Sequence, residues 1–309
     1  MYTTLMFVAS FVINAVRGLF PFFLLSVSVA SLIKTLKLEQ YFKKAFLGRQ
    51  LASIPIASGT GAFSPLCSCG VIPAIAAMLA AGIPLAPIMS FWITSPLMSP
   101  ESFVLTYSIL GREMAIARLL ATLVIGLVAG YMTLYLMQKG FLDEQVLKDF
   151  GGVNNTSAQS LLDAEKNLEM RQLIILRLFQ FLFNVKDMGI FIGKYILIAF
   201  VLEALIVRYV PMELVASLLG SGNDAGPLLA ALIGIPAYAS SISAMPVVRG
   251  FMDLGMDKGT ALAFMIGGAA TSIPAMAAVF SIVKRKVFFL YIAYSMVGAV
   301  ASGYLFRLF

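Results

Sequence analysis

The sequence predicts an all-α polytopic membrane protein, and its composition, its long apolar windows and its internal similarity are the three observations that predict this fold class. Of its 309 residues, 60% are hydrophobic and only 12% are charged, whereas roughly one quarter of the residues in a soluble domain are charged. The mean hydropathy is +0.94. The composition therefore excludes a soluble globular domain, and we expect the lipid bilayer to be the protein's main partner.

Apolar windows occur along most of the chain. One helix needs about 20 apolar residues to cross the hydrocarbon core, and on this basis we expect about 8–10 membrane segments. The windows are 5–36, 50–82, 84–110, 113–137, 188–208, 226–254, 257–282 and 287–308. No basic region or cleavage pattern of a signal peptide precedes the first window, so we expect it to be retained in the membrane.

One stretch, residues 138–172, is clearly polar and rich in charge, Asn, Gln and Ser. It divides the chain into three parts. We predict a first transmembrane repeat over 1–137, a soluble linker on the cytoplasmic side over 138–172, and a second transmembrane repeat over 173–309.

The two predicted repeats resemble each other in the spacing of their prolines and glycines. Pro73 is followed nine residues later by Gly82, as Pro246 is by Gly255. The segment SPLCSCGVIP before the first proline matches IPAYASSISAMP before the second. The triplet Thr94, Ser95 and Pro96 likewise resembles Thr271, Ser272 and Pro274.

Charge indicates how the repeats are oriented. Lys284, Arg285 and Lys286 form a basic turn, whereas the corresponding 111–113 is nearly neutral. Lysine and arginine mark the cytoplasmic side, so corresponding turns are expected on opposite sides of the membrane. This predicts inverted-topology repeats, an architecture of transporters. The net charge of +7 then reflects membrane anchoring, and we expect no nucleic-acid partner.

Six of the thirteen prolines fall between residues 65 and 100. Proline removes a helical hydrogen bond, and broken backbone at membrane depth is tolerated only where protein or a watery cavity surrounds it. We therefore predict proline-broken helices, re-entrant or spanning, with half-helices at Gly70–Ala81 and Met245–Leu254 whose N-termini point into the protein. Kinked helices in a tight bundle are the alternative.

The residues before these half-helices are the predicted substrate site. They are Cys67, Ser68 and Cys69 on one side and Tyr238, Ser240, Ser241 and Ser243 on the other, with Thr94 and Ser95 completing the set. Two sulfurs two residues apart can converge on one soft ion where the backbone is irregular. Cys67 and Cys69 would be metal ligands only if the solute is a soft metal; packing is the alternative, because buried cysteine also behaves as a small hydrophobe.

Four carboxylates lie in or beside apolar windows. Glu101 and Glu203 are candidates for carrying protons in coupled transport, because burying a charge in a membrane is costly and such residues are usually functional. Asp253 and Asp257 flank Gly255, and we expect them at a solvated helix end.

The motifs PLCSCGVIP, Gly82-Ile83-Pro84-Leu85 and SFWITSPLM, followed in the second half by GIPAY and LAFMIGGAATSIPA, resemble the ArsP-like predicted permeases. This family includes efflux permeases for methylated trivalent arsenicals and proposed copper or zinc exporters. The resemblance implies an inner-membrane permease, of the bacterial plasma-membrane type, in arsenical or metal resistance. The chain departs from it at Ser99-Pro100-Glu101, where related sequences often place an asparagine, so the solute stays open.

Together these observations predict a secondary transporter that exports a soft or thiol-reactive solute and needs no cofactor. Two alternatives stay open: transport of a small anion or sulfur compound held at half-helix N-termini, and a membrane subunit of a two-component complex. A homodimer or a small partner subunit is compatible with either. An intramembrane enzyme using Cys67 is disfavoured, since the chain has no histidine and Cys67 has no obvious base.

Overall fold

The computed structural model describes residues 50–64, 71–80, 82–142, 224–237 and 241–308, with the single positions 6, 10, 13 and 201. These ranges form ten α-helices and no strand. The first five helices are α3 (Gln50–Ala62), α4 (Val71–Ala80), α5 (Leu85–Leu97), α6 (Pro100–Leu110) and α7 (Arg112–Gln138). The other five are α11 (Gly226–Ala237), α12 (Ser241–Asp253), α13 (Lys258–Thr271), α14 (Ile273–Ile282) and α15 (Arg285–Arg307). The predicted helical class is confirmed, and the division of the chain into three parts stays a prediction.

Three stretches of the described chain are long and apolar enough to cross a bilayer. They are Arg112–Gln138, Lys258–Ala277 and Arg285–Arg307, with mean hydropathies of 2.0, 1.4 and 1.5. At 1.5 Å per residue, α7 is about 40 Å long, which exceeds the ~30 Å of a hydrocarbon core. These lengths and compositions are those of a helical membrane protein.

The two faces of α7 show that its surroundings are apolar. Away from its ends, the exposed side chains of α7 are large and hydrophobic and follow one stripe of the helix: Ile116, Leu120, Val124, Val128, Tyr131 and Tyr135. Its buried face is made mostly of small or polar residues, among them Thr122, Gly126, Ala129, Gly130 and Thr133. This distribution is the reverse of a soluble amphipathic helix. It is typical of a membrane helix that presents apolar side chains to lipid and packs against its neighbours through small residues.

The helices form two similar groups. Helices α3, α5 and α7 pack against one another, as do α11, α13 and α15. Both groups depend on close backbone approach: a Cβ on Gly126 would lie 2.2 Å from Cγ2 of Thr94, and one on Gly267 would lie 2.9 Å from Cα of Ala231. The short helices link the groups, because α12 packs against α6 and α4 packs against α14.

Helices α4 and α12 end in the same way. Gly82 and Gly255 follow them with φ angles of 77° and 104°, a left-handed conformation that favours glycine. In each case the next residue, Ile83 or Met256, donates its N–H to a carbonyl five residues earlier and buries its side chain. This is the Schellman termination of a helix. The glycines that the sequence comparison matched therefore have matching structural roles.

The N-termini of α7 and α13 lie at the same end of the bundle as the C-terminus of α15. The Lys258 ammonium is 2.7 Å from a carboxylate oxygen of Glu113, and the Arg307 guanidinium is 3.3 Å from Asp257. Asp257 also caps α13, accepting from the Thr260 N–H at 2.9 Å. Asp253 is 60% exposed and pairs with Arg249. The expectation that both aspartates lie at a helix end is met, although Asp257 is only partly exposed.

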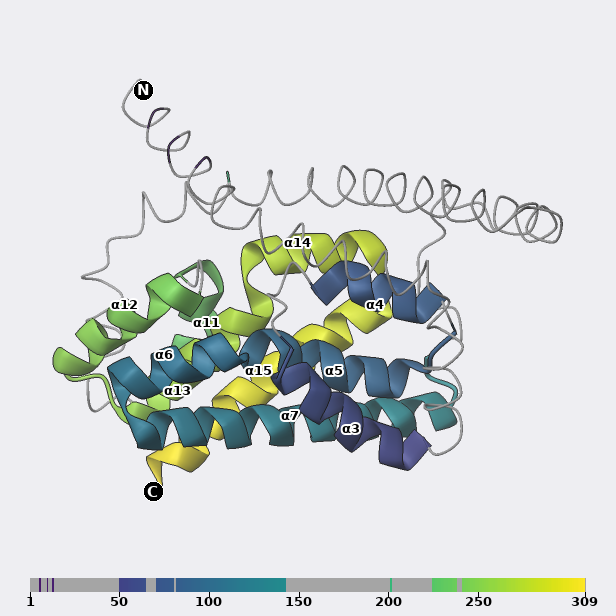
Figure 1. The fold of residues 1–309 in the computed structure, drawn as a ribbon, viewed down its shortest axis with the longest axis horizontal. Coiled ribbons are helices and arrows are strands. Elements are labelled where there is room, and N and C mark those ends of the chain that lie inside the picture. The colour runs from purple at the N-terminus through teal and green to yellow at the C-terminus, as the bar shows by residue number, and fades with distance from the viewer. Residues whose placement is uncertain are drawn as a thin grey trace, which may run out of the picture.

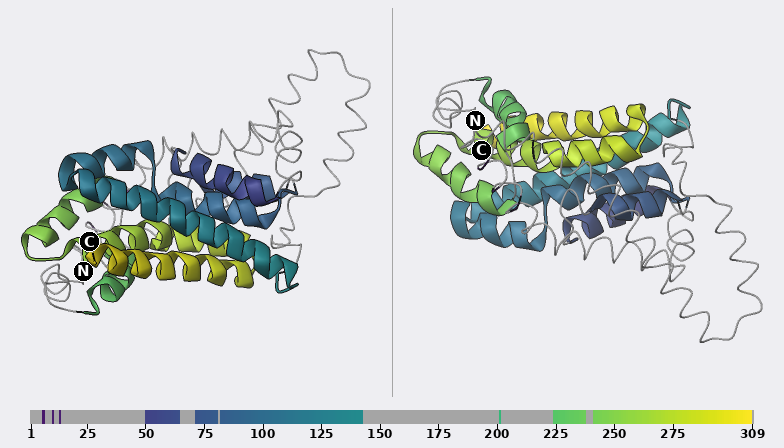
Figure 2. Two further views of the ribbon diagram at one scale, coloured as in Figure 1. Left: turned by 90° about the horizontal axis from the view of Figure 1, so that it is seen from below. Right: turned by 90° about the horizontal axis from the view of Figure 1, so that it is seen from above.

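The C-terminus of α7 and the N-terminus of α15 lie at the opposite end of the bundle. The Lys286 ammonium is 5.5 Å from the ring centroid of Phe141, which follows α7. Helices α7 and α15 therefore run side by side in opposite directions (Figures 1 and 2). The turn at Gly111 and the turn at Lys284 consequently lie at opposite ends of the bundle.

Candidate functional site

The predicted windows 84–110 and 257–282 are each interrupted once. The first splits into α5 and α6 at Met98 and Ser99, whose ψ angles of 133° and 160° are extended. The second splits into α13 and α14 at Ser272, whose ψ angle is 146°. Extended backbone leaves helix ends to be satisfied inside the protein. The Ser99 hydroxyl meets part of this need by accepting from the Ser102 N–H at 3.1 Å.

Arg118 satisfies the carbonyl end of the first interruption. Its Nε donates to the carbonyl of Leu97, the last residue of α5, at 3.1 Å, and its Nη1 donates to Oγ1 of Thr106 in α6 at 3.0 Å. Its Nη1 also lies 4.0 Å from Sδ of Met245 in α12. The Arg118 side chain is fully buried within a candidate membrane span, and it ties three helices to α7. A buried guanidinium in a span is a functional candidate by default.

Tyr291 occupies the corresponding place at the second interruption. Arg118 stands six residues after the start of α7, and Tyr291 stands six residues after the start of α15. The Tyr291 hydroxyl donates to the carbonyl of Ala270 in the last turn of α13. Each long helix thus carries one buried side chain that hydrogen-bonds the end of an interrupted helix, a cation in one case and a neutral phenol in the other.

The two helix groups meet at an aromatic contact. The ring of Trp92, in α5, stacks on that of Tyr291 with centroids 4.8 Å apart and planes inclined by 23°. Trp92 is 1% exposed, and Ser295, one turn further along α15, is 0% exposed. Within the described part of the chain, neither the Trp92 indole nitrogen nor the Ser295 hydroxyl has a hydrogen-bond partner. This contact is therefore buried, apolar and incompletely satisfied.

The predicted half-helices agree with the structure in one case and differ in the other. Helix α4 matches the predicted 70–81 segment within one residue at each end. Helix α12 begins at Ser241, four residues before the predicted start, and contains Pro246. Pro246 stands in the second turn of α12, where it has no N–H to donate to the carbonyl four residues earlier, so the helix begins before its proline and not at it. Whether these segments are re-entrant stays a prediction.

Most of the predicted site lies outside the described residues. This applies to Cys67, Ser68, Cys69, Tyr238, Ser240 and Glu203. Ser241 and Ser243 lie in the first turn of α12, where the backbone alone is described. The helix ends that adjoin this set are buried, since Val71, which follows Gly70, and Met245 are both 0% exposed. Among the described residues, no three His, Cys, Asp or Glu side chains cluster in a way that could hold a metal ion.

Three predicted residues are described in full. Thr94 and Ser95 lie in the last turn of α5 and are buried. The Thr94 hydroxyl donates to the carbonyls of Ser90 and Phe91 in its own helix, and its methyl group faces Gly126. A part for Thr94 and Ser95 in binding the substrate stays a prediction. Glu101 lies exposed in the first turn of α6, and its part in proton coupling stays a prediction.

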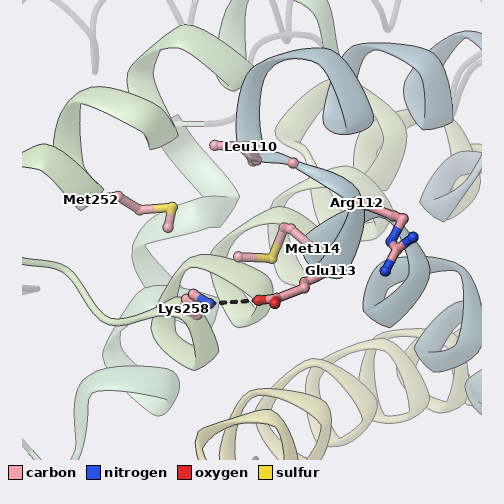
Figure 3. Close-up of a pocket in the computed structure, with 7 residues that line it drawn as sticks. Leu110, Arg112, Glu113, Met114, Met252 and Lys258 are labelled. Carbon is pink, nitrogen blue, oxygen red and sulfur yellow. Dashed lines mark hydrogen bonds and ion pairs between the residues drawn. The ribbon is translucent and has the colours of Figure 1, made fainter.

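A shallow pocket of about 290 Å³ lies at the end of the bundle where α7 and α13 begin. Figure 3 shows Lys258 and Glu113 paired across it, with Met114 and Met252 beside them. The two charged side chains are 60% and 75% exposed, so their pairing contributes little to stability. This pocket is an opening at the end of the bundle, apart from the helix interruptions.

Sequence reasoning did not select Arg118 or Trp92 as functional residues. A signal for Arg118 was present, because it is the one charge in the interior of the apolar window 113–137. An arginine on the outer face of the helix would extend its charge to the membrane surface, whereas one on the inner face would be buried. The sequence does not show which face of the helix is turned inward. Trp92 carries no such signal, since tryptophan is common both in cores and at membrane interfaces.

Comparison with known proteins places the sequence in a family. Residues 3–308 match the model of the ArsP family, which is described as a predicted permease. The UPF0718 protein YcgR of Bacillus subtilis is 22% identical over 294 residues, covering 93% of this chain and 92% of that protein. The UPF0718 protein MJ0584 of Methanocaldococcus jannaschii is 19% identical over 338 residues, covering 95% and 92%. No solved structure matches the chain.

Proposed function

The chain belongs to the ArsP family of predicted permeases, and from this premise we propose that it is a secondary transporter that exports a soft or thiol-reactive solute across the plasma membrane. The solute class covers trivalent organoarsenicals and soft metal ions. In this proposal the site lies near the midplane between the two halves, and the protein is a transporter and not an enzyme. The paired interruptions at Met98–Ser99 and Ser272 are the observation that carries the proposal.

The helix directions support an inverted-topology repeat. Helices α3 to α7 correspond in order to α11 to α15, and the matched helices α7 and α15 are antiparallel. Helices α5 and α13 also run in opposite directions, because Ala86 at the start of α5 lies beside Gly130 near the finish of α7, whereas α13 starts beside the start of α7. Transporters built in this way bind solute where their discontinuous helices meet.

Charge supports an orientation. The end of the bundle with the start of α15 carries Lys139, Lys284, Arg285 and Lys286. The other end combines basic and acidic groups in equal numbers among the described residues, namely Arg112, Arg249, Lys258 and Arg307 against Glu113, Asp224, Asp253 and Asp257. Both ends thus carry four lysines or arginines among the described residues, so the positive-inside rule, which counts basic residues alone, does not choose between them. We propose that the first end is cytoplasmic because its basic residues have no acidic residues beside them to offset their charge, and the beginning of the 138–172 linker would then lie on the same side.

The cysteines give the site its proposed preference for soft solutes. Thiolates are soft ligands, and Cys67 and Cys69 directly precede α4, whose first residues are buried. Tyr238 and Ser240 precede α12 in the same way and would supply polar contacts from the other half. Short helices that begin inside the protein also direct free N–H groups toward the solute.

The test is uptake into everted membrane vesicles and proteoliposomes. The panel is a trivalent methylarsenical, arsenite, copper(I), zinc and thiosulfate, assayed with the wild type, Cys67→Ser and Cys69→Ser. Ser68→Ala is the matched control, since it changes the residue between the cysteines and leaves both sulfurs in place. We expect one soft solute to accumulate and either cysteine substitution to abolish the uptake. Normal transport by both cysteine variants would contradict the thiol site.

A small anion is the second candidate solute, and Arg118 favours it. A guanidinium buried beside a helix interruption raises the local positive potential. Thiosulfate in the panel represents this class. Uptake of thiosulfate that both cysteine variants retain would favour the anion over the thiol-reactive solute.

A further inference from the structure

The hydroxyl of Tyr294, in α15, is one of three buried polar atoms that have no hydrogen-bond partner among the described residues. The other two lie where α5 meets α15. They are the Trp92 indole nitrogen and the Ser295 hydroxyl oxygen, and their side chains are 1% and 0% exposed. Other buried hydroxyls are used: those of Thr106, Thr122 and Thr133 each donate to a carbonyl four residues earlier. A buried polar group without a partner is uncommon, and each case requires an explanation such as a bound molecule.

Trp92 and Ser295 lie at or next to one aromatic contact. The Trp92 ring stacks on Tyr291, and Ser295 follows Tyr291 by one helical turn on the same buried stripe of α15. Tyr291 itself is satisfied, because its hydroxyl donates to Ala270. The contact joins the first helix group to the second, since Trp92 lies in α5 and Ser295 in α15.

The contact between α5 and α15 lies at the depth expected of a transport site. Ser295 stands ten residues after the start of the 23-residue helix α15 and is therefore close to the middle of a candidate membrane span. Trp92 lies in α5, five residues before the helix ends at the Met98–Ser99 interruption. Substrate sites of inverted-repeat transporters lie near the midplane at the interface of the halves.

We propose that the Trp92 indole N–H and the Ser295 hydroxyl form a polar subsite that hydrogen-bonds an oxygen atom of the transported solute. An indole N–H can only donate, so it stabilises an acceptor and offers nothing to a bare cation. The solute class is therefore narrowed to hydroxylated or oxyanionic molecules, and a free metal ion is disfavoured. This inference rests on the proposed transport function and adds a chemical requirement to it.

The chain provides its own probe, because Trp92 is the single tryptophan in the sequence. In ¹⁵N-labelled full-length protein in nanodiscs, the indole N–H gives one assignable cross-peak. We expect this cross-peak to shift saturably with a trivalent methylarsenical, which carries hydroxyl groups in water, or with thiosulfate. Copper(I) is expected to leave it in place. Ser295→Ala should weaken the response, whereas Ser90→Ala, which removes a buried hydroxyl that donates to Ile54 within the first helix group, should not.

Transport gives the second measurement. Trp92→Phe keeps a six-membered aromatic ring to pack against Tyr291 and removes the five-membered ring that carries the indole N–H. Loss of one net hydrogen bond corresponds to a roughly 3- to 10-fold rise in KM, and we expect this rise for Trp92→Phe and for Ser295→Ala with the transported oxygen-bearing probe. Melting temperatures show whether a variant is misfolded. If it is, the response of the wild-type Trp92 cross-peak to the probes tests the subsite without that variant.

The outcomes separate the two proposals. A cross-peak that does not respond to a probe that the wild type transports overturns the subsite and leaves the transport function standing. A cross-peak that exchanges with water and responds to no probe identifies a bound water only, and it also overturns the subsite. A response to thiosulfate or the methylarsenical without uptake of either probe supports the subsite and contradicts the transport proposal.

Discussion

The hydrogen bond between Arg118 and Thr106 allows a quantitative test of the first interruption. Nη1 of Arg118 is 3.0 Å from Oγ1 of Thr106, and both side chains are fully buried. A hydrogen bond to a charged group contributes about 1.5–3 kcal/mol. Replacing Arg118 alone would also remove the cost of burying a guanidinium, so a single variant does not report the strength of this bond.

A double-mutant cycle cancels that cost. The free energy of unfolding is measured by denaturant titration in detergent micelles for the wild type, Arg118→Met, Thr106→Val and the double variant. The coupling energy is the difference between the effect of the double variant and the sum of the single effects. We expect about 1.5–3 kcal/mol. Thr106 also donates to Ser102, but that bond is lost equally with and without Arg118 and drops out of the cycle.

The control cycle combines Arg118→Met with Thr133→Val. Thr133 is buried in the same helix and donates to Ala129, about 22 Å along the helix axis from Arg118. The effects of distant substitutions on the free energy of unfolding are additive to within about 0.5 kcal/mol. If the Arg118–Thr106 cycle also gave less than about 0.5 kcal/mol, it would falsify the inference that Arg118 fixes the α5–α6 interruption.

Two further predictions concern packing and orientation. Gly259→Ala should destabilise the protein by about 1–3 kcal/mol, because its Cβ would lie 2.3 Å from the carbonyl oxygen of Gly303. Gly250→Ala, with nothing within 4 Å of the added Cβ, should leave the melting temperature unchanged or raise it, and equal melting temperatures for the two variants would contradict the close contact of α13 with α15. With both native cysteines replaced by serine, Lys286→Cys should react with an impermeant maleimide from the cytoplasmic side and Lys258→Cys from the opposite side. Labelling with the two sides exchanged would show that the orientation is wrong, and labelling of both positions from one side would contradict their placement at opposite ends of the bundle.

Hydrophobic pattern predicted the long helices closely. The window 113–137 corresponds to α7 at Arg112–Gln138, and 287–308 corresponds to α15 at Arg285–Arg307. Both helices have charged or glycine-containing ends and an uninterrupted apolar interior, so composition alone delimits them. The matched glycines at 82 and 255 were also found from spacing, because a left-handed helix end strongly favours glycine.

The interruptions could not be located in the same way. Pro96 stands inside α5, whereas the break falls at Met98 and Ser99. Proline has no N–H to donate wherever it stands in a helix, and α5 nonetheless continues through Pro96. Pro100 disfavours helical backbone at Ser99, which precedes it. Ser99 is then free to cap α6. Which of two neighbouring prolines breaks a helix depends on the caps and on donors such as Arg118, and these donors come from another helix.

The two interruptions are chemically unequal, and this inequality bears on the proposed transport. A guanidinium supports the first, and a neutral phenol supports the second. The hydrogen-bond partners of Arg118 in α5 and α6 belong to the same half of the chain as Arg118. Its 4.0 Å contact with Sδ of Met245 joins it to the second half. If the halves move against each other, the two bonds of 3.0 and 3.1 Å are the stronger links, because sulfur is a weak acceptor. Arg118 should therefore move with the first half, while Met245 slides past it with α12. An arginine that keeps its position beside the interruption can attract an anionic or oxygen-bearing solute in both conformations, and the solute's release must then depend on the second half.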